Sequence, residues 1–199
     1  PITVDTPGGT AASLANFVVL IPPTNDQFAI AQLISGNNGS VSGANTDATK
    51  ESGEPNHAGS AGGRSVWYRW IAPASGAWVF NTRGSAVDTL MAVYTGNAVN
   101  ALTLVASNDD SGAETASCVA FNAVSGQEYR IAVDSVGASS GTLVLNWSFL
   151  GNAPVICDFT PAEGGIFSTV TIKGFNFENV TAVQFNGVNS PSFVTDSSQ

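Results

Sequence analysis

The chain has 199 residues, 43% of them aliphatic or aromatic and only 11% charged, and its net charge is −9. This length allows one large domain or two smaller ones, and the scarcity of Glu, Lys, Arg and Gln favours strands and tight turns over solvated helices. The acidic balance argues against nucleic-acid binding, because such a surface repels phosphate groups. No apolar run reaches the ~20 residues that a membrane-spanning helix needs.

Short runs of strand character recur along the chain and are separated by turns rich in Gly, Pro and Asn. Runs of four to eight residues at this spacing predict an all-β sandwich or barrel. Helical periodicity is weak and is confined to Phe28–Leu33. The predicted strands are Phe17–Leu20, Ser65–Ile71, Ala77–Asn81, Thr89–Tyr94, Leu102–Ala106, Ser117–Ala123, Tyr129–Asp134, Thr142–Phe149, Thr169–Lys173 and Ala182–Phe185.

Three of these strands alternate between two distinct faces, as a half-buried strand does. The opposite face of the strand near residue 120 carries Cys118. Aromatic residues on strands could form a platform that stacks on carbohydrate, but they more often belong to the core, and we expect core here. The predicted inward sets are Val66, Tyr68 and Trp70; Val119, Phe121 and Ala123; and Leu143, Leu145 and Trp147.

Two proline-containing segments divide the chain. Ile21–Thr24 and Gly151–Pro154 both read as stiff, extended linkers. They separate a head (residues 1–20) from a body (residues 25–150) and a tail (residues 151–199), with residues 21–24 as the first linker. Both end pieces are too small to be stable sandwich domains on their own.

The two end pieces resemble opposite ends of one family, the IPT/TIG immunoglobulin-like domain. The tail is similar to the first strands of such a domain and the head to its last two, so one strand and its turns are missing between them. The matching stretches of the tail are Pro154–Pro161, Glu163–Gly165, Thr169–Phe177 and Ala182–Val188, and those of the head are Pro1–Thr10 and Ala15–Val19.

The body resembles the bacterial pre-peptidase C-terminal (PPC-like) domain, which is related to collagen-binding modules of secreted proteases. The resemblance implies a jelly-roll-type β-sandwich, flanked here by the immunoglobulin-like portions, and a non-catalytic role in a large secreted or surface protein. The matching stretches are Asn25–Phe28, Gly53–His57, Ser65–Trp70, Asp88–Tyr94, Ser107–Gly112 and Gly126–Asp134.

Catalytic motifs are absent from the sequence, and we predict that the chain is not an enzyme. The single histidine, His57, lies in a predicted loop, and no serine stands in a Gly-x-Ser-x-Gly motif. Neither an HExxH motif, a CxxC motif nor a phosphate-binding loop occurs.

Calcium is the candidate cofactor, because oxygen-bearing side chains gather at strand ends and in turns, and Ca²⁺ prefers oxygen ligands. The related collagen-binding modules use an Asn-Asp pair at the start of the domain, but the acidic residues that they carry before the central aromatic strand are replaced here by Arg64–Val66. The alternative is that these residues only stabilise turns. The candidate ligands are Asn25, Asp26, Glu54, Asp88, Asp109 and Asp110.

A disulfide between Cys118 and Cys157 is predicted across the boundary between body and tail. Two cysteines in a chain of secreted character usually pair, and both positions could face one crevice between the domains. The alternative is two separately buried thiols.

These features favour a structural or adhesive repeat segment of a large extracellular bacterial surface protein or filament. Its expected partners are other copies of the chain or neighbouring repeats, joined head to tail by completing the immunoglobulin-like domains. Extracellular polysaccharide or a host matrix protein is a further possible partner. The alternative function is a polysaccharide- or collagen-binding accessory module of a secreted hydrolase.

Overall fold

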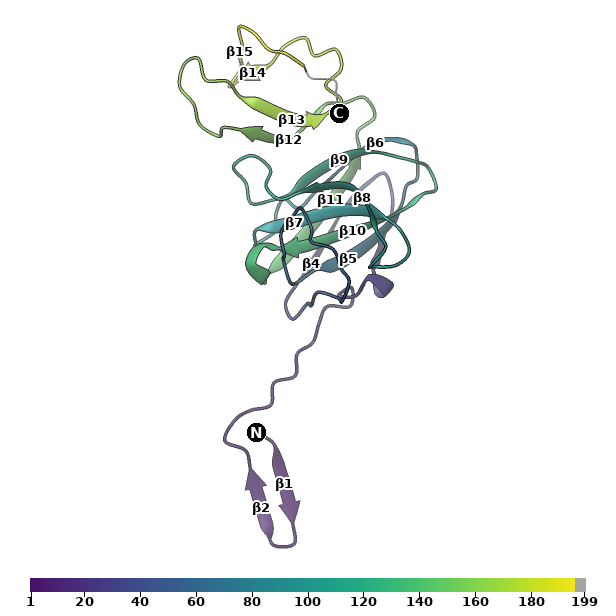
Figure 1. The fold of residues 1–199 in the computed structure, drawn as a ribbon, viewed down its shortest axis with the longest axis vertical. Helices are drawn as coiled ribbons and strands as arrows, with labels where there is room; N and C mark the ends of the chain where they lie inside the picture. The colour runs from purple at the N-terminus through teal and green to yellow at the C-terminus, as the bar shows by residue number, and fades with distance from the viewer. Residues whose placement is uncertain (196–199) are drawn as a thin grey trace.

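Two β-sheets pack face to face in the middle of the chain (Figure 1), in a computed structural model that describes residues 1–195. Neighbouring strands are antiparallel except β3 and β5, which run parallel. The predicted all-β sandwich is therefore confirmed. The five-stranded sheet has the order β3 (Gln32–Ile34), β5 (Val66–Ile71), β10 (Glu128–Ser135), β7 (Thr89–Thr95) and β8 (Thr103–Asn108). The four-stranded sheet has the order β4 (Asn38–Ala44), β11 (Thr142–Phe149), β6 (Gly76–Asn81) and β9 (Cys118–Ala123).

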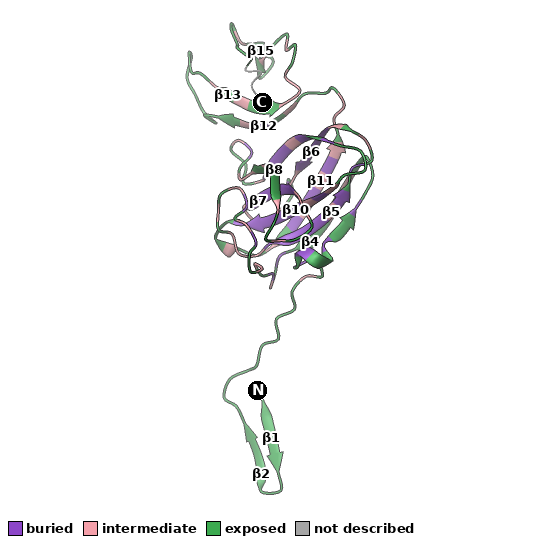
Figure 2. Cartoon of the chain, turned by 45° about the vertical axis from the view of Figure 1, so that its right-hand side comes forward, coloured by how far each residue is buried: buried purple, intermediate pink, exposed green. Residues whose placement is uncertain are grey.

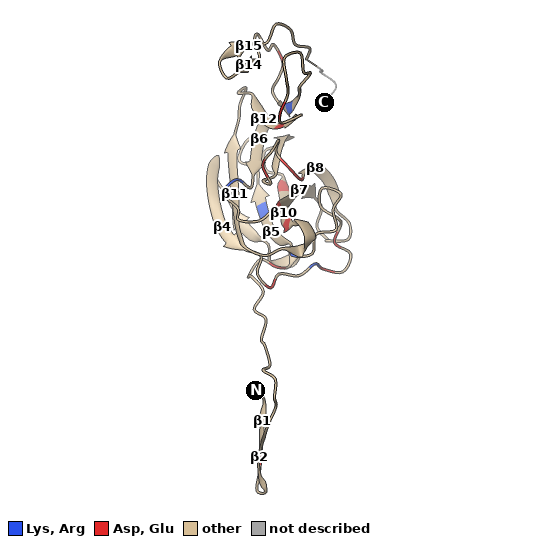
Figure 3. Cartoon of the chain, turned by 90° about the vertical axis from the view of Figure 1, so that its left-hand side faces the viewer, with Lys and Arg blue, Asp and Glu red and all other residues tan. Residues whose placement is uncertain are grey.

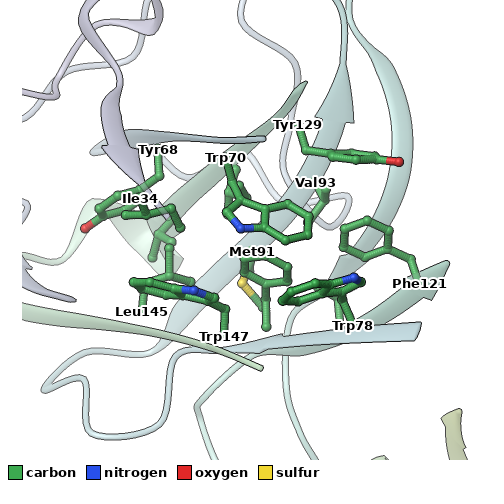
Figure 4. Packing of buried hydrophobic residues seen from close by; sticks show 14 of the residues in the cluster. Ile34, Tyr68, Trp70, Trp78, Met91, Val93, Phe121, Tyr129, Leu145 and Trp147 are labelled. Atoms are coloured by element: carbon green, nitrogen blue, oxygen red, sulfur yellow. The ribbon is translucent and has the colours of Figure 1, made fainter. Parts of the chain in front are cut away.

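The main core fills the space between the two sheets (Figure 4). Trp70 lies at its centre, with ring centroids 4.6 Å from Trp78 and 5.2 Å from Phe80. All three inward-facing sets predicted from alternation belong to this core. All four Trp and all three Tyr side chains of the protein are buried, as Trp67, Trp70, Trp78, Trp147, Tyr68, Tyr94 and Tyr129.

A second, smaller core covers the outer face of the five-stranded sheet. Trp67 points to this face, opposite to its neighbours on β5, and its ring meets the edge of Phe28 at 5.2 Å. Phe28 belongs to the 3-10 turn η1 (Phe28–Ile30), so the weak helical periodicity produces a single turn before β3 begins. The guanidinium of Arg130 lies 4.5 Å from the Phe28 ring centroid and closes this small core at its edge. A second 3-10 turn, η2 (Val136–Ala138), follows β10.

Strand β4 was not predicted, because Gly, Ser and Asn dominate its sequence and have low strand propensity. It forms through pairing with β11, in register from Asn38 opposite Ser148 to Ala44 opposite Thr142. Gly39 allows the close packing, since a Cβ atom there would lie 2.3 Å from the Trp147 ring. The strand is thus stabilised by its partner rather than by its own residues.

The two ends of the chain extend from opposite ends of the sandwich (Figure 1). The head forms a hairpin of β1 (Thr3–Thr6) and β2 (Gly9–Ala12), followed by an extended segment. The predicted strand Phe17–Leu20 is wrong within this structure, because no neighbouring strand is present there to pair with it.

The tail forms two small sheets. One contains β12 (Val155–Thr160) and β13 (Thr171–Phe175), and the other contains β14 (Gln184–Phe185) and β15 (Val188–Asn189). Head and tail are largely exposed, in contrast to the body (Figure 2). Within residues 1–195 there is no helix with the length and apolar character needed to cross a membrane.

Candidate functional site

The junction between body and tail contains the predicted disulfide, Cys118–Cys157. The two Cα atoms lie 5.1 Å apart, and 39 positions separate the cysteines in the sequence. Cys118 begins β9 and points away from the main core, as its face of the strand predicts. Around the bond a small apolar cluster forms from Val79, Ala120, Leu150 and Val155. Strand β12 of the tail is thereby joined to β9 at the edge of the four-stranded sheet.

The loop between β8 and β9 makes further polar contacts with the tail. The hydroxyl of Ser111 donates a hydrogen bond to the carbonyl oxygen of Cys157. The N–H of Gly112 donates to Oδ1 of Asp158 at 3.0 Å. These contacts were missed at the sequence level, where Ser-Gly after an acidic pair signals only a turn. The junction therefore combines a covalent bond, apolar packing and hydrogen bonds.

Three of the six predicted calcium ligands meet beside this junction. Carboxylate oxygens of Asp88, Asp109 and Asp110 all lie within 4.8 Å of one another. We call these residues the acidic triad. Strand pairing brings them together, because Asp88 precedes β7 and the other two follow β8, whose Asn108 lies opposite Met91. Acidic loops at this end of the sandwich are visible in Figure 3.

The acidic triad is electrostatically strained. Oδ1 of Asp88 and Oδ1 of Asp109 are buried and have no hydrogen-bond partner. Burial, together with the charge of Asp110, raises the pKa of both carboxyl groups above the usual range of aspartate. Carboxylates held close together without partners resemble the ligand set of a hard cation.

The other three predicted ligands lie elsewhere and are engaged with protein groups. The amide of Asn25 donates to the carbonyl oxygen of Trp67. Both carboxylate oxygens of Asp26 accept hydrogen bonds from Thr49, at 2.6 Å and 2.9 Å. The first contact attaches the start of the body to β5, which is separated from β7 by β10, and the second attaches it to the loop between β4 and β5.

Glu54, the last of the six, forms a buried network with His57 and Tyr94. Nε2 of His57 lies 2.8 Å from Oε1 of Glu54, and Nδ1 lies 2.8 Å from the Tyr94 hydroxyl. Burial and the nearby Glu54 charge raise the pKa of Tyr94. A carboxylate only accepts hydrogen bonds, so Nε2 of the neutral imidazole is its donor and Nδ1 accepts from the Tyr94 hydroxyl. The tautomer consistent with this geometry carries its proton on Nε2 and donates to Glu54.

The network holds a loop against the sheet. Glu54 and His57 side chains are both fully buried, and the imidazole meets the Trp67 ring edge-on at 5.5 Å. Burial favours a higher pKa for Glu54, but hydrogen bonds from His57, Ser65 and the backbone of Glu51 outweigh it and lower the pKa below its ordinary value. Such a histidine is not presented to a substrate.

Comparisons with known proteins give matches only among solved structures. No protein-family model matches the chain, and no curated protein matches it. The pre-peptidase C-terminal domain of collagenase from Bacillus anthracis matches at 15% identity with a TM-score of 0.40, over 59% of this chain and 94% of that one. PliG of Aeromonas hydrophila, a periplasmic inhibitor of g-type lysozyme, matches at 13% identity with a TM-score of 0.40, over the same shares of the two chains. At these identities the similarities concern the fold alone.

Proposed function

We propose that the chain is a non-catalytic structural segment of an extracellular protein, and that its body holds the following β-module in a fixed orientation. The observation that carries this proposal is the disulfide between Cys118 of the body and Cys157 of the tail. A bond that closes a loop of 39 residues stabilises the closed form by about 4 kcal/mol in chain-entropy terms. Disulfides also favour an oxidising, extracellular location.

The resemblance of the body to PPC-like modules and of the ends to IPT/TIG domains supports the same proposal. Both families occur as non-catalytic modules of bacterial surface and secreted proteins. The burial of His57 also favours a structural role over catalysis. The burial of every Trp and Tyr favours it over the alternative of a polysaccharide-binding module, because none of these rings is free to stack on a sugar.

The orientation of the tail can be measured by ¹⁵N relaxation of the intact chain. We expect amides of β12 and β13 to share one rotational correlation time with amides of the body. In the double variant Cys118→Ser/Cys157→Ser we expect the tail to reorient faster. Val188→Ser, an exposed substitution in the tail, is the control and leaves the shared correlation time unchanged. Independent tumbling of the tail in the oxidised wild-type chain would contradict the proposed function.

Calcium binding stays a prediction, and we propose the acidic triad as its site, because these three carboxylates lie within 4.8 Å of one another. A cation there would neutralise the buried oxygens of Asp88 and Asp109 and would stiffen the loop that contacts the tail. An ion that binds only the folded state at 100 times its Kd adds about 2.7 kcal/mol of stability.

The test is the melting temperature of the body with excess Ca²⁺ and with EDTA. We expect Ca²⁺ to raise it in the wild type and to have little effect in Asp109→Asn. Glu163→Gln removes an equal charge from an exposed position of the tail and should retain the full response. Equal melting temperatures of the wild type under both conditions would exclude the calcium site.

A further inference from the structure

We infer that the tail is a docking surface for the N-terminal segment of a second copy of this chain, so that copies join head to tail. The inference rests on the proposed structural function, and it names the partner that such a segment takes. The N-terminal segment meant here is residues 1–21, which comprises the hairpin β1–β2 and the extended stretch after it.

The tail exposes apolar side chains that a folded module buries. Phe167 is 99% exposed, Val194 is 96% exposed and Ile166 is 89% exposed. Among its described residues Cys157 alone is buried, in a small cluster to which the body contributes most of the apolar side chains and the tail only Val155. Removing apolar surface from water is favourable by ~25 cal/mol per Å², so a partner that covers these side chains is strongly stabilised.

The tail also has free strand edges. Within the described part of the chain, β13 pairs only with β12 and β14 pairs only with β15. A two-stranded sheet is marginally stable in water, and its open edge presents N–H and C=O groups to an added strand. Strand addition to such an edge is a common mode of peptide recognition.

The N-terminal segment has the features of a missing strand. Residues 17–21 read Phe-Val-Val-Leu-Ile, and each side chain is between 65% and 76% exposed. In an extended chain, Phe17, Val19 and Ile21 share one face while Val18 and Leu20 share the other. A strand that is apolar on both faces belongs in the interior of a sheet, between two covered layers.

The two surfaces do not meet within one copy. The N-terminal segment leaves the body beside Asp47, whose carboxylate accepts a hydrogen bond from the N–H of Ile21 at 3.2 Å. The tail is attached through Cys157 at the other end of the sandwich (Figure 1). Within one copy, the body keeps the N-terminal segment away from the tail. A second copy, displaced along the long axis, can place its own N-terminal segment against this tail.

The low charge of the N-terminal segment also suits it to bind the tail of another copy. The chain as a whole carries a net charge of −9, but Asp5 is the only charged side chain among residues 1–21. The docking segment therefore meets little repulsion from an acidic partner. Because head and tail are different surfaces, the contact is heterologous and repeats without closing, which builds a linear assembly.

Sedimentation velocity of the intact chain over a range of concentrations tests the inference. We expect masses that increase with concentration as multiples of the monomer. A synthetic peptide of residues 1–21 should occupy the tails and return the chain to monomers. Hydrogen exchange should then be slowed in β13 and β14 and unchanged in the body.

Matched variants identify the occupant. Phe17→Ser/Val19→Ser changes only exposed residues of the N-terminal segment, so the body folds normally and assembly is lost. Ile30→Ser changes an exposed apolar residue of the body and leaves assembly intact. A monomer at every concentration whose tail gains no protection from the peptide would overturn the inference. Assembly that survives Phe17→Ser/Val19→Ser would overturn it as well, because another surface would then be responsible.

A covalent version tests whether residues 1–21 are sufficient to cover the tail. In it, a second copy of residues 1–21 follows residue 199 through a flexible linker. We expect this chain to be monomeric, with slowed exchange in β13 and β14. If docking fails, body and tail still share one correlation time. If the proposed function fails, the tail tumbles independently of the body, so the two results are distinguishable.

Discussion

Replacement of His57 by Phe tests whether the buried Glu54–His57–Tyr94 network is structural. The substitution preserves an aromatic ring against Trp67 but removes both polar contacts of the imidazole, each of which measures 2.8 Å. Glu54 then keeps the N–H of Glu51 and the side chain of Ser65 as donors but loses its contact with the ring. The body should fold with the same topology and with much lower stability.

The magnitude follows from the burial of the carboxylate. Both side chains of the Glu54–His57 pair are 0% exposed, and depriving a buried carboxylate of its hydrogen-bond donor costs about 3 kcal/mol. Tyr94→Phe removes only a neutral hydroxyl from the same network and should cost about 1 kcal/mol. The two variants therefore differ by several-fold in their effect on the free energy of unfolding.

The loss should depend on pH in a defined direction. In the wild type the pKa of Glu54 is below its ordinary value of 4.5, so the stability it contributes is present above that value and is lost as pH falls through the folded pKa. In His57→Phe the desolvated carboxylate loses its main donor and its pKa increases. The difference in stability between the two proteins should therefore be largest near neutral pH and smaller near pH 4.

Urea unfolding at neutral pH and at about pH 4 measures these differences. Glu54→Gln/His57→Phe, which has no carboxylate at this position, should show little of the pH dependence. A cost of His57→Phe below that of Tyr94→Phe, or a cost independent of pH, would refute the reasoning.

Two further predictions concern the body. Leu145→Ala, at a fully buried core position, should cost about 3–5 kcal/mol in urea unfolding, whereas Val124→Ala, at an exposed position, should stay within about 0.5 kcal/mol. Gly62→Ala should destabilise strongly by thermal unfolding, because φ is +57° and the new Cβ would lie 1.8 Å from a carboxylate oxygen of buried Asp134. Gly126→Ala, with φ of +81° and no atom within 4 Å of the new Cβ, should show only the backbone strain of about 1 kcal/mol. Equal effects of the two glycine substitutions would contradict the steric argument.

Alternation in the sequence was sufficient to predict the strands whose two faces differ. Residues such as Val119 and Phe121 face the main core while Cys118 faces the tail, because a strand with one buried face has a single workable register. Strand β4 could not be predicted this way, since Asn38–Ala44 forms only through pairing with β11 and packing of Gly39 under Trp147. The strand propensity of such a segment is too low to predict it, and its conformation is determined by the strand with which it pairs.

The candidate site was predicted in part for a similar reason. Strand pairing brings the acidic triad together, and a single sequence does not show which strands are neighbours. Asp26 and Glu54 look like further ligands in the sequence, yet each accepts hydrogen bonds that attach a loop to the body. Loop carboxylates serve either as metal ligands or as hydrogen-bond acceptors that hold a loop in place, and only the folded structure distinguishes the two roles.

The disulfide also determines how the chain would respond to mechanical tension. A pull on the tail reaches Cys157, passes through the bond to Cys118 and leaves along the chain toward β8, so the residues between the two cysteines carry no force. Strands β10 and β11 lie within that shielded stretch. The cysteines are separated by 39 positions, and an extended chain spans about 3.4 Å per residue. The gain in length on forced unfolding should therefore be about 130 Å smaller for the oxidised chain than for the reduced chain.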